Sequence, residues 1–340
     1  MKISVDGGGL CADENNRFGN YVFSENLIRA LLNYDTSNQY YVYSFCPKPK
    51  FIKQSKNFIY KNLQPKLFWS SIRVSVEAVI DKKDYFLALN QSIPLIKNSK
   101  IISFSHGLSY YFFPKFYPDS QSKLKRQMDR MIDKSDRIVV SSIKVRNELR
   151  LINQSVNTKI EVIPYGVSDD MSDYTQKQRE KFFLFVGMDH PIKNIDFIVE
   201  AFERFKNSKT GKGFRLILVS NIILNRWSND VIIINNPSRV KLKQLYQEAT
   251  ALLTASLYES FNLPVLEALA QNCPVISLPS AIIPEQASFV NIAGNKNEFV
   301  SIMKNAVNNQ LSPINIKKIN QTFSWEKYVS KIINLYTLLI

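Results

Sequence analysis

The chain has 340 residues, of which 45% are hydrophobic and 21% are charged. This composition is too apolar for a disordered chain, and the length suffices for two buried cores. The charge is basic, because 44 Lys and Arg face 29 Asp and Glu, and division at residue 175 leaves +8 before it and +7 after it. Such an excess is typical of proteins that bind nucleic acids, anionic membranes or phosphorylated ligands, and it does not distinguish among them.

The cysteines and the amino terminus predict a cellular compartment. Cys11, Cys46 and Cys273 are odd in number and widely spaced, with no Cys-x-x-Cys and no metal-like pairing with a histidine. We therefore expect reduced thiols in a cytosolic protein. No apolar signal core follows the first residues, and no run reaches the roughly 18 apolar residues of a membrane-spanning helix. The prediction is a cytoplasmic protein, soluble or peripheral on the inner face of a membrane.

Short apolar runs alternate along the chain with segments of helical period, which predicts β-α units on parallel sheets. A polar stretch without strand or helical pattern, residues 165–181, predicts a linker between two α/β domains. Two such domains usually bind ligands at the carboxyl ends of their strands. The predicted strands are residues 3–5, 40–45, 85–89, 101–104, 138–140, 160–163, 182–186, 216–219, 231–234, 251–254 and 275–278.

Residues 251–285 form the most informative segment, a predicted strand, loop, helix and strand. Pro264 suits a first helical position, and Asn272 suits a left-handed cap before the next strand. Glu259 falls in the loop and Glu267 in the first turn of the helix. A helix start favours phosphate oxygens, while carboxylates accept hydrogen bonds from sugar and ribose hydroxyls. The alternative is that Glu267 only complements the helix dipole and that Glu259 is a solvated loop residue.

Lys193 is the clearest candidate partner for an anion. It lies just after a predicted strand and before a helix that starts near Asn194. A cation opposes the dipole at a helix start, so a purely structural role is less favourable there. The alternative is a solvated lysine.

Residues 259–268 resemble the signature of retaining glycosyltransferase family 4, the group 1 glycosyl transferases. That signature is a Glu-x7-Glu segment commonly written Glu-Gly-Phe-Gly-Leu-Pro, then x-x-Glu-Ala, and here Ser260 and Asn262 replace its two glycines. The likeness extends over nearly the whole chain. Its other parts are Met1 to Leu32 with Gly19 and Tyr21, His106-Gly107-Leu108, Asp136 to Ser142, Ile163 to Val167, Phe185-Val186-Gly187 with Pro191, Lys193 and Asn194, and Phe323-Ser324-Trp325-Glu326.

The resemblance implies an α/β fold of GT-B type. In it, two Rossmann-like parallel-sheet domains face each other across a cleft, and a C-terminal helix crosses back to the N-terminal domain. We expect an N-terminal acceptor-binding domain at residues 1–168 with helix 326–340, and a C-terminal nucleotide-sugar-binding domain at residues 169–325.

The resemblance also implies roles for individual residues. Glu259, Lys193 and His106 are the expected catalytic residues, and His106 would approach the sugar or the acceptor. Independently of the resemblance, Tyr110 and Tyr111 follow His106 closely in the chain and are expected to line the acceptor cleft. The two tyrosines are alternatively core residues, and a lone histidine such as His106 is often structural. The expected donor-binding residues are Gly19, Gly187, Lys193, Asn194, Ser260, Phe261, Asn262, Leu263 and Glu267.

The chain departs from the family pattern beside Lys193. The family places an arginine there, and this chain has Met188 early and Ile192 immediately before the lysine. Arg226 and Arg239 are candidate replacements for the second diphosphate cation. No Asp-x-Asp pair stands at a strand end, so the expected reaction is metal-independent and uses no cofactor.

Basic residues are dense in the N-terminal half. Residues 48–100 hold 11 basic and 3 acidic residues, and residues 123–150 hold 9 and 4. Phe51, Phe58, Tyr60, Phe68 and Trp69 are interleaved with these charges. This predicts a basic, aromatic face that rests on an anionic membrane and receives a lipid-linked acceptor. The alternative is an ordinary solvated surface.

The sequence therefore predicts a retaining hexosyltransferase for surface polysaccharide or glycoconjugate synthesis. Its partners would be a nucleotide-sugar donor, with GDP-mannose favoured, and a glycan or lipid-linked acceptor. A degenerate GT-B protein that binds a nucleotide sugar or a partner without turnover is the alternative. A nucleic-acid-binding role has only the charge in its favour, and no such signature is present, so we expect no nucleic-acid partner.

Overall fold

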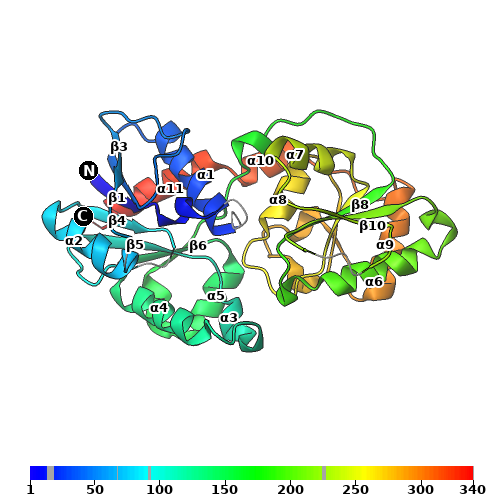
Figure 1. Cartoon of the computed structure of the whole chain (residues 1–340), viewed down its shortest axis with the longest axis horizontal. Coiled ribbons are helices and arrows are strands. Elements are labelled where there is room, and N and C mark those ends of the chain that lie inside the picture. The colour runs from blue at the N-terminus through cyan, green and yellow to red at the C-terminus, as the bar shows by residue number, and fades with distance from the viewer. Residues whose placement is uncertain (14–18, 67, 91–92, 224–226, 340) are drawn as a thin grey trace. The chain divides into compact units, whose positions relative to one another are not determined.

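The computed structural model describes residues 1–13, 19–66, 68–90, 93–223 and 227–339. The chain divides into two compact units, coloured along the sequence in Figure 1. Unit 1 comprises residues 1–165 and 325–340, and unit 2 comprises residues 166–324.

The described part of unit 1 is built on seven parallel strands in the order β3-β2-β1-β4-β5-β6-β7. They are β1 (Lys2–Asp6), β2 (Gln39–Ser44), β3 (Phe58–Asn62), β4 (Tyr85–Ala88), β5 (Lys100–Ser105), β6 (Arg137–Val140) and β7 (Ile160–Val162). All six strands predicted here are confirmed, and β3 was missed.

Strand β3 corrects the predicted aromatic face. It pairs in parallel with β2, with Tyr40 opposite Phe58. Phe58 and Tyr60 are buried against the sheet, so their prediction as surface residues is wrong. The indole of Trp69 is also turned inward, where its Nε1–H donates to Asp6 Oδ1 at 3.0 Å. Phe68 remains exposed.

Unit 2 holds a parallel sheet of six strands among its described residues, in the order β10-β9-β8-β11-β12-β13. They are β8 (Phe182–Val186), β9 (Arg215–Val219), β10 (Val231–Ile234), β11 (Ala251–Thr254), β12 (Val275–Ser277) and β13 (Asn291–Ile292). The five predicted strands are confirmed. The two residues of β13 are too few to give a period in the sequence.

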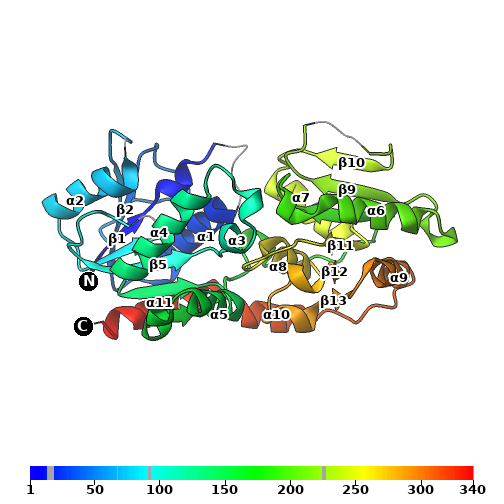
Figure 2. The same cartoon turned by 90° about the horizontal axis from the view of Figure 1, so that it is seen from below.

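Helices cover both sheets (Figure 1 and Figure 2). Those of unit 1 are α1 (Gly19–Tyr34), α2 (Val74–Ile80), α3 (Ser109–Phe112), α4 (Gln121–Lys134), α5 (Ile143–Ile152) and α11 (Trp325–Thr337). Those of unit 2 are α6 (Ile195–Lys206), α7 (Arg239–Glu248), α8 (Leu263–Ala270), α9 (Lys296–Val307) and α10 (Ile316–Thr322). None of the described helices is long and apolar enough to cross a membrane.

The last helix belongs to unit 1, as expected. Helix α11 packs against α1, and the Tyr85 hydroxyl donates to the carbonyl oxygen of Tyr336 at 2.6 Å. The chain therefore leaves unit 1 after residue 165 and returns to it at residue 325. Two parallel-sheet, Rossmann-like units with a returning C-terminal helix form the GT-B fold.

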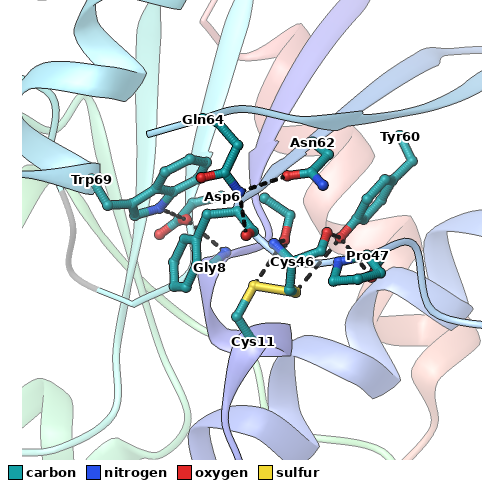
Figure 3. The surroundings of a disulfide bond; sticks show 11 residues. Asp6, Gly8, Cys11, Cys46, Pro47, Tyr60, Asn62, Gln64 and Trp69 are labelled. Carbon is teal, nitrogen blue, oxygen red and sulfur yellow. Dashed lines mark hydrogen bonds between the residues drawn. A yellow bond between two sulfur atoms is a disulfide. The ribbon is translucent and has the colours of Figure 1, made fainter. Parts of the chain in front are cut away.

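The prediction of reduced cysteines is wrong for two of the three. Cys11 and Cys46 form a disulfide with a Cα–Cα distance of 5.5 Å (Figure 3). Parallel pairing of β1 with β2, with Asp6 opposite Tyr43, places the loop after β1 beside the end of β2. Sequence spacing could not reveal this, because the strand order brings residues 35 positions apart together. Cys273 is a buried free thiol, and burial raises its pKa to about 11.

Candidate functional site

The centre of the candidate site in unit 2 is an ion pair. Lys193 ends a short 3-10 turn (Pro191–Lys193) after β8, and Glu259 lies in the loop after β11. Lys193 Nζ donates to Glu259 Oε1 at 2.6 Å, and the two side chains are only 20% and 10% exposed. The backbone joins the same two loops, because the Leu257 N–H donates to the Ile192 carbonyl at 2.8 Å. Two residues predicted from separate motifs therefore meet at the carboxyl edge of the sheet.

Asparagines hold the backbone of both loops in a left-handed conformation. Asn194 has φ +53° at the start of α6, and Asn262 has φ +61° at the start of α8. Asn is among the few residues that adopt this region readily. Each amide also braces its loop: Asn194 Nδ2 donates to the Ala255 carbonyl at 3.1 Å, and Asn262 Nδ2 donates to the Ala281 carbonyl at 2.9 Å. Asn262 thus has a left-handed backbone, which glycine also adopts readily, and adds a tertiary hydrogen bond.

Four further predicted donor-binding residues, Gly187, Ser260, Phe261 and Leu263, lie on or beside the loops that follow β8 and β11. Gly187 follows β8, and a Cβ there would lie 2.9 Å from the Phe185 ring, which explains the glycine. Ser260 and Leu263 are partly buried beside Glu259 and Asn262. The Phe261 side chain is buried, with its ring 6.0 Å from that of Phe323, so the segment would offer its backbone to a ligand.

Helix α8 begins at Leu263, one residue before the predicted first position at Pro264. Asn272 takes the predicted left-handed conformation after it, with φ +56°. Glu267, however, is the fifth residue of the helix, so its placement in the first turn is wrong. Its carboxylate is buried and turned toward α7. There Glu267 Oε2 accepts from the Tyr246 hydroxyl at 3.0 Å, and Glu267 Oε1 lies 2.8 Å from Arg239 Nη2.

Arg239 connects Glu267 to a second carboxylate. Its Nε donates to Asp170 Oδ2 at 2.6 Å, and its Nη2 donates to Asp170 Oδ1 at 3.1 Å. Burial alone would lower the pKa of Arg239, but Glu267 and Asp170 raise it above the ordinary value. Burial likewise tends to raise the pKa of Asp170, and the bonds from Arg239 bring it below the usual range. The arginine is therefore a fixed cation that holds two carboxylates.

The other arginine considered as a diphosphate partner, Arg226, lies outside the described residues. Tyr246 was missed by sequence reasoning. Its spacing of seven from Arg239 on α7 places both side chains on one helical face, which is the signal that could have found it. Within the described ranges, no group of three or more His, Cys, Asp or Glu side chains could hold a metal ion.

His106 lies just after β5 in unit 1. Its Nε2–H donates to the Leu89 carbonyl at 2.5 Å, and its Nδ1 lies 3.0 Å from the Tyr165 hydroxyl. Burial lowers the pKa of His106 to about 4, so the ring is neutral at pH 7 and Nδ1 accepts from Tyr165. Both ring nitrogens are thus bonded within unit 1.

The other residues predicted in unit 1 do not gather around His106. The Tyr110 side chain is buried in the core of unit 1, and burial raises the pKa of its phenol. Tyr111 is partly buried, with Lys125 Nζ 4.9 Å from its ring centroid. Gly19 is exposed at the start of α1, and a Cβ there would meet open space.

Comparison with known proteins identifies the family and the relatives that this chain resembles. Residues 180–309, all in unit 2, match the family described as glycosyl transferases group 1. The chain is 28% identical over 225 residues to the O-antigen chain mannosyltransferase RfbU of Salmonella typhimurium, covering 62% of this chain and 59% of that protein. It is 23% identical over 296 residues to the O-antigen chain mannosyltransferase B of Escherichia coli, covering 77% and 76%.

A solved structure shares the whole architecture. Anabaena Alr3699/HepE in complex with UDP and glucose superimposes with a TM-score of 0.71 at 14% identity, and 99% of each chain is covered. This likeness concerns the fold.

Proposed function

We propose that this chain moves a hexose from a nucleotide-sugar donor to a glycan or lipid-linked acceptor. The reason is that the chain belongs to the group 1 glycosyltransferases and has the GT-B fold. The product would be part of a surface polysaccharide or glycoconjugate, formed with retention of anomeric configuration. The observation that carries the proposal is the Lys193–Glu259 pair, 2.6 Å apart inside the segment that matches the family.

The pair suits the chemistry of glycosyl transfer. The bond from the sugar to a diphosphate breaks while positive character grows at the anomeric carbon, so the site must stabilise an anion beside a cation-like sugar. Lys193 supplies a fixed ammonium for the leaving diphosphate. Glu259 orients that ammonium and accepts hydrogen bonds from sugar hydroxyls. Because the lysine provides the positive charge, we propose a metal-independent reaction.

Glu267 is suited to the ribose of the donor. Its buried carboxylate has one oxygen bonded to Tyr246 and the other to Arg239, which leaves further lone pairs as acceptors for ribose hydroxyls. The backbone of residues 260–263 would lie along the sugar and diphosphate. We propose GDP-mannose as the donor, since the Salmonella and Escherichia relatives are named mannosyltransferases. A UDP-sugar is the competing choice, because the Anabaena structure holds UDP and glucose.

A nucleotide screen tests the donor. Thermal unfolding is measured with GDP, UDP, ADP and dTDP, and the matching nucleotide at 100 times its dissociation constant should add roughly 2.7 kcal/mol of stability. Stabilisation by UDP and not by GDP would reject the mannose donor while leaving glycosyl transfer in place.

A transfer assay tests turnover itself. The full chain is incubated with a panel of nucleotide sugars and with glycan and lipid-linked acceptors, and sugar transfer and donor hydrolysis are followed. Binding without turnover for every combination would contradict the enzyme and favour the degenerate GT-B protein. The left-handed backbone of Asn262 supports an active enzyme, because glycine, which the family signature has at this position, adopts the same conformation readily.

A further inference from the structure

The second helix of unit 1 exposes most of its aliphatic side chains. It consists of α2 and a preceding π-helical turn (Trp69–Arg73). Four of its five larger aliphatic side chains, Ile72, Val76, Val79 and Ile80, are exposed. Val74 is buried in the core of unit 1, and the polar Ser75 and Glu77 are buried beside it. A surface helix normally turns its apolar face toward the core.

Specific bonds fix this orientation. Ser75 Oγ donates to the Ser71 carbonyl at 2.6 Å and accepts from the Leu95 N–H at 2.7 Å. Glu77 pairs with Lys61 at 3.0 Å and with Arg73 at 3.2 Å. The bonds to Leu95 and Lys61 hold this face to the body of unit 1, which leaves the four exposed aliphatic side chains on the outer face.

Neighbouring side chains extend the outward face. The bonded loop contributes Leu95 and Ile96, and Phe68 precedes the helix. We call the set Phe68, Ile72, Val76, Val79, Ile80, Leu95 and Ile96 the outer apolar stripe, whose members are 43% to 74% exposed. It contains seven of the sixteen large hydrophobic side chains that are exposed in the described ranges. Both views place α2 at the margin of unit 1 (Figure 1 and Figure 2).

The same unit carries most of the positive charge. Unit 1 holds 27 basic and 15 acidic residues, a net +12, and unit 2 holds 17 and 14, a net +3. The division at residue 175 hides this difference, because Asp169, Asp170 and Asp173 fold with unit 2. Lys66 and Lys82, which flank the helix in sequence, are both exposed.

We propose that the outer apolar stripe docks unit 1 on a bilayer that contains anionic phospholipids. Apolar side chains on a basic body are the combination that binds such surfaces, by insertion at the headgroup level together with charge attraction. A second copy of the chain fits less well, because two units of +12 would be brought face to face. The inference rests on the proposed function in one respect: a docked enzyme would meet a lipid-linked acceptor.

Vesicle flotation of the full chain tests the stripe. Phosphatidylcholine vesicles are compared with vesicles in which a third of the lipid is phosphatidylglycerol. The wild type should bind the anionic vesicles and lose binding as salt is raised. A Val79→Glu, Ile80→Glu variant should bind at least tenfold more weakly. The control is Leu151→Glu with Leu338→Glu, which adds the same charge at exposed positions of unit 1 outside the stripe.

Three results would overturn the inference: no binding of wild type to anionic vesicles, equal loss in the control, or a stripe variant that binds like wild type. A concentration-dependent dimer that only the stripe variant abolishes would assign the stripe to a second copy. Thermal shift with the nucleotide separates the two proposals. A stripe variant that keeps the nucleotide response shows an intact donor site, and failure of every donor leaves the vesicle result standing.

Discussion

Two predicted site residues of unit 2, Lys193 and Glu259, meet in a single ion pair, whereas in unit 1 Tyr110 is buried in the core and His106 is bonded to residues of its own unit. In unit 2, Lys193 and Glu259 are bonded at the edge of the sheet, on loops set by Asn194 and Asn262. In unit 1, His106 has both nitrogens bonded internally. The difference lies in what the motifs specify. Asn and Pro at particular positions fix the backbone and so place a side chain, whereas a histidine or a tyrosine near a strand end leaves its direction to the packing around it.

The disulfide should stabilise unit 1 and leave unit 2 unchanged. Replacing Cys11 and Cys46 by serine should lower the free energy of unfolding of unit 1 by about 4 kcal/mol, because the bridge closes a loop of 35 positions. Unit 2, which has no part in the bridge, should be unaffected. Hydrogen exchange in urea, followed on peptides from each unit, measures the free energy of unfolding of unit 1 and of unit 2 separately.

Reductant provides the matched control for this variant. It should weaken wild-type unit 1 by the same amount and leave the double serine variant unchanged. Equal protection of unit 1 with and without reductant would contradict a stabilising bridge.

Removal of the Lys193 ammonium should have the largest effect on turnover. Lys193→Ala is expected to reduce kcat by ~10²–10³, the typical cost of losing one preorganised group that stabilises developing negative charge. Steady-state transfer kinetics measure it. Lys206→Ala is a suitable control, because Lys206 is 18% exposed and pairs with Asp230 at 2.9 Å in the same unit. A Lys193→Ala enzyme within a few-fold of the control would show that the leaving group does not depend on this lysine.

His106 should make unit 1 sensitive to acid. Its folded pKa of about 4 lies below the ordinary 6.5, so the folded state resists protonation more than the unfolded state. The neutral ring therefore contributes stability that is fully present above pH 6.5 and is lost as pH falls toward 4, by about 3 kcal/mol. Urea midpoints measured across this range should fall in wild type and fall less in His106→Gln. An identical dependence of the urea midpoint on pH in both proteins would show that the acid sensitivity arises at other residues. His190→Gln is the control.

The sequence predicted most of the fold because parallel strands buried on both faces give continuous apolar runs. It missed β3, where Lys61 and Asn62 interrupt the run, and it assigned Phe58 and Tyr60 to the surface for the same reason. It also missed the Cys11–Cys46 bridge and the Arg239–Glu267 contact. Both join residues that are distant in the sequence and come together only through the order of strands and helices in the folded unit. The Glu-x7-Glu segment was readable because its spacing is local.

The smallest predicted effect concerns the ribose side of the site. Arg239→Ala should leave Glu267 bonded only through Tyr246 among the contacts described above, and the carboxylate would then be less well positioned. We expect affinity for the preferred nucleoside diphosphate to fall about tenfold, as for loss of one charge-assisted hydrogen bond. The preference for that nucleotide over its 2′,3′-dideoxy form should shrink in the variant. Isothermal titration with both nucleotides measures the two quantities.

The paired nucleotides also distinguish two roles for Arg239. If it acts through Glu267, the dideoxy nucleotide, which lacks the hydroxyls, should bind wild type and variant alike. If it contacts the diphosphate directly, both nucleotides should lose affinity equally, and the positioning role would be wrong. Glu267→Gln serves as the reference. Removal of the carboxylate charge should abolish the preference for the ribose nucleotide over its dideoxy form. In the double variant, Arg239→Ala should then reduce this preference little further.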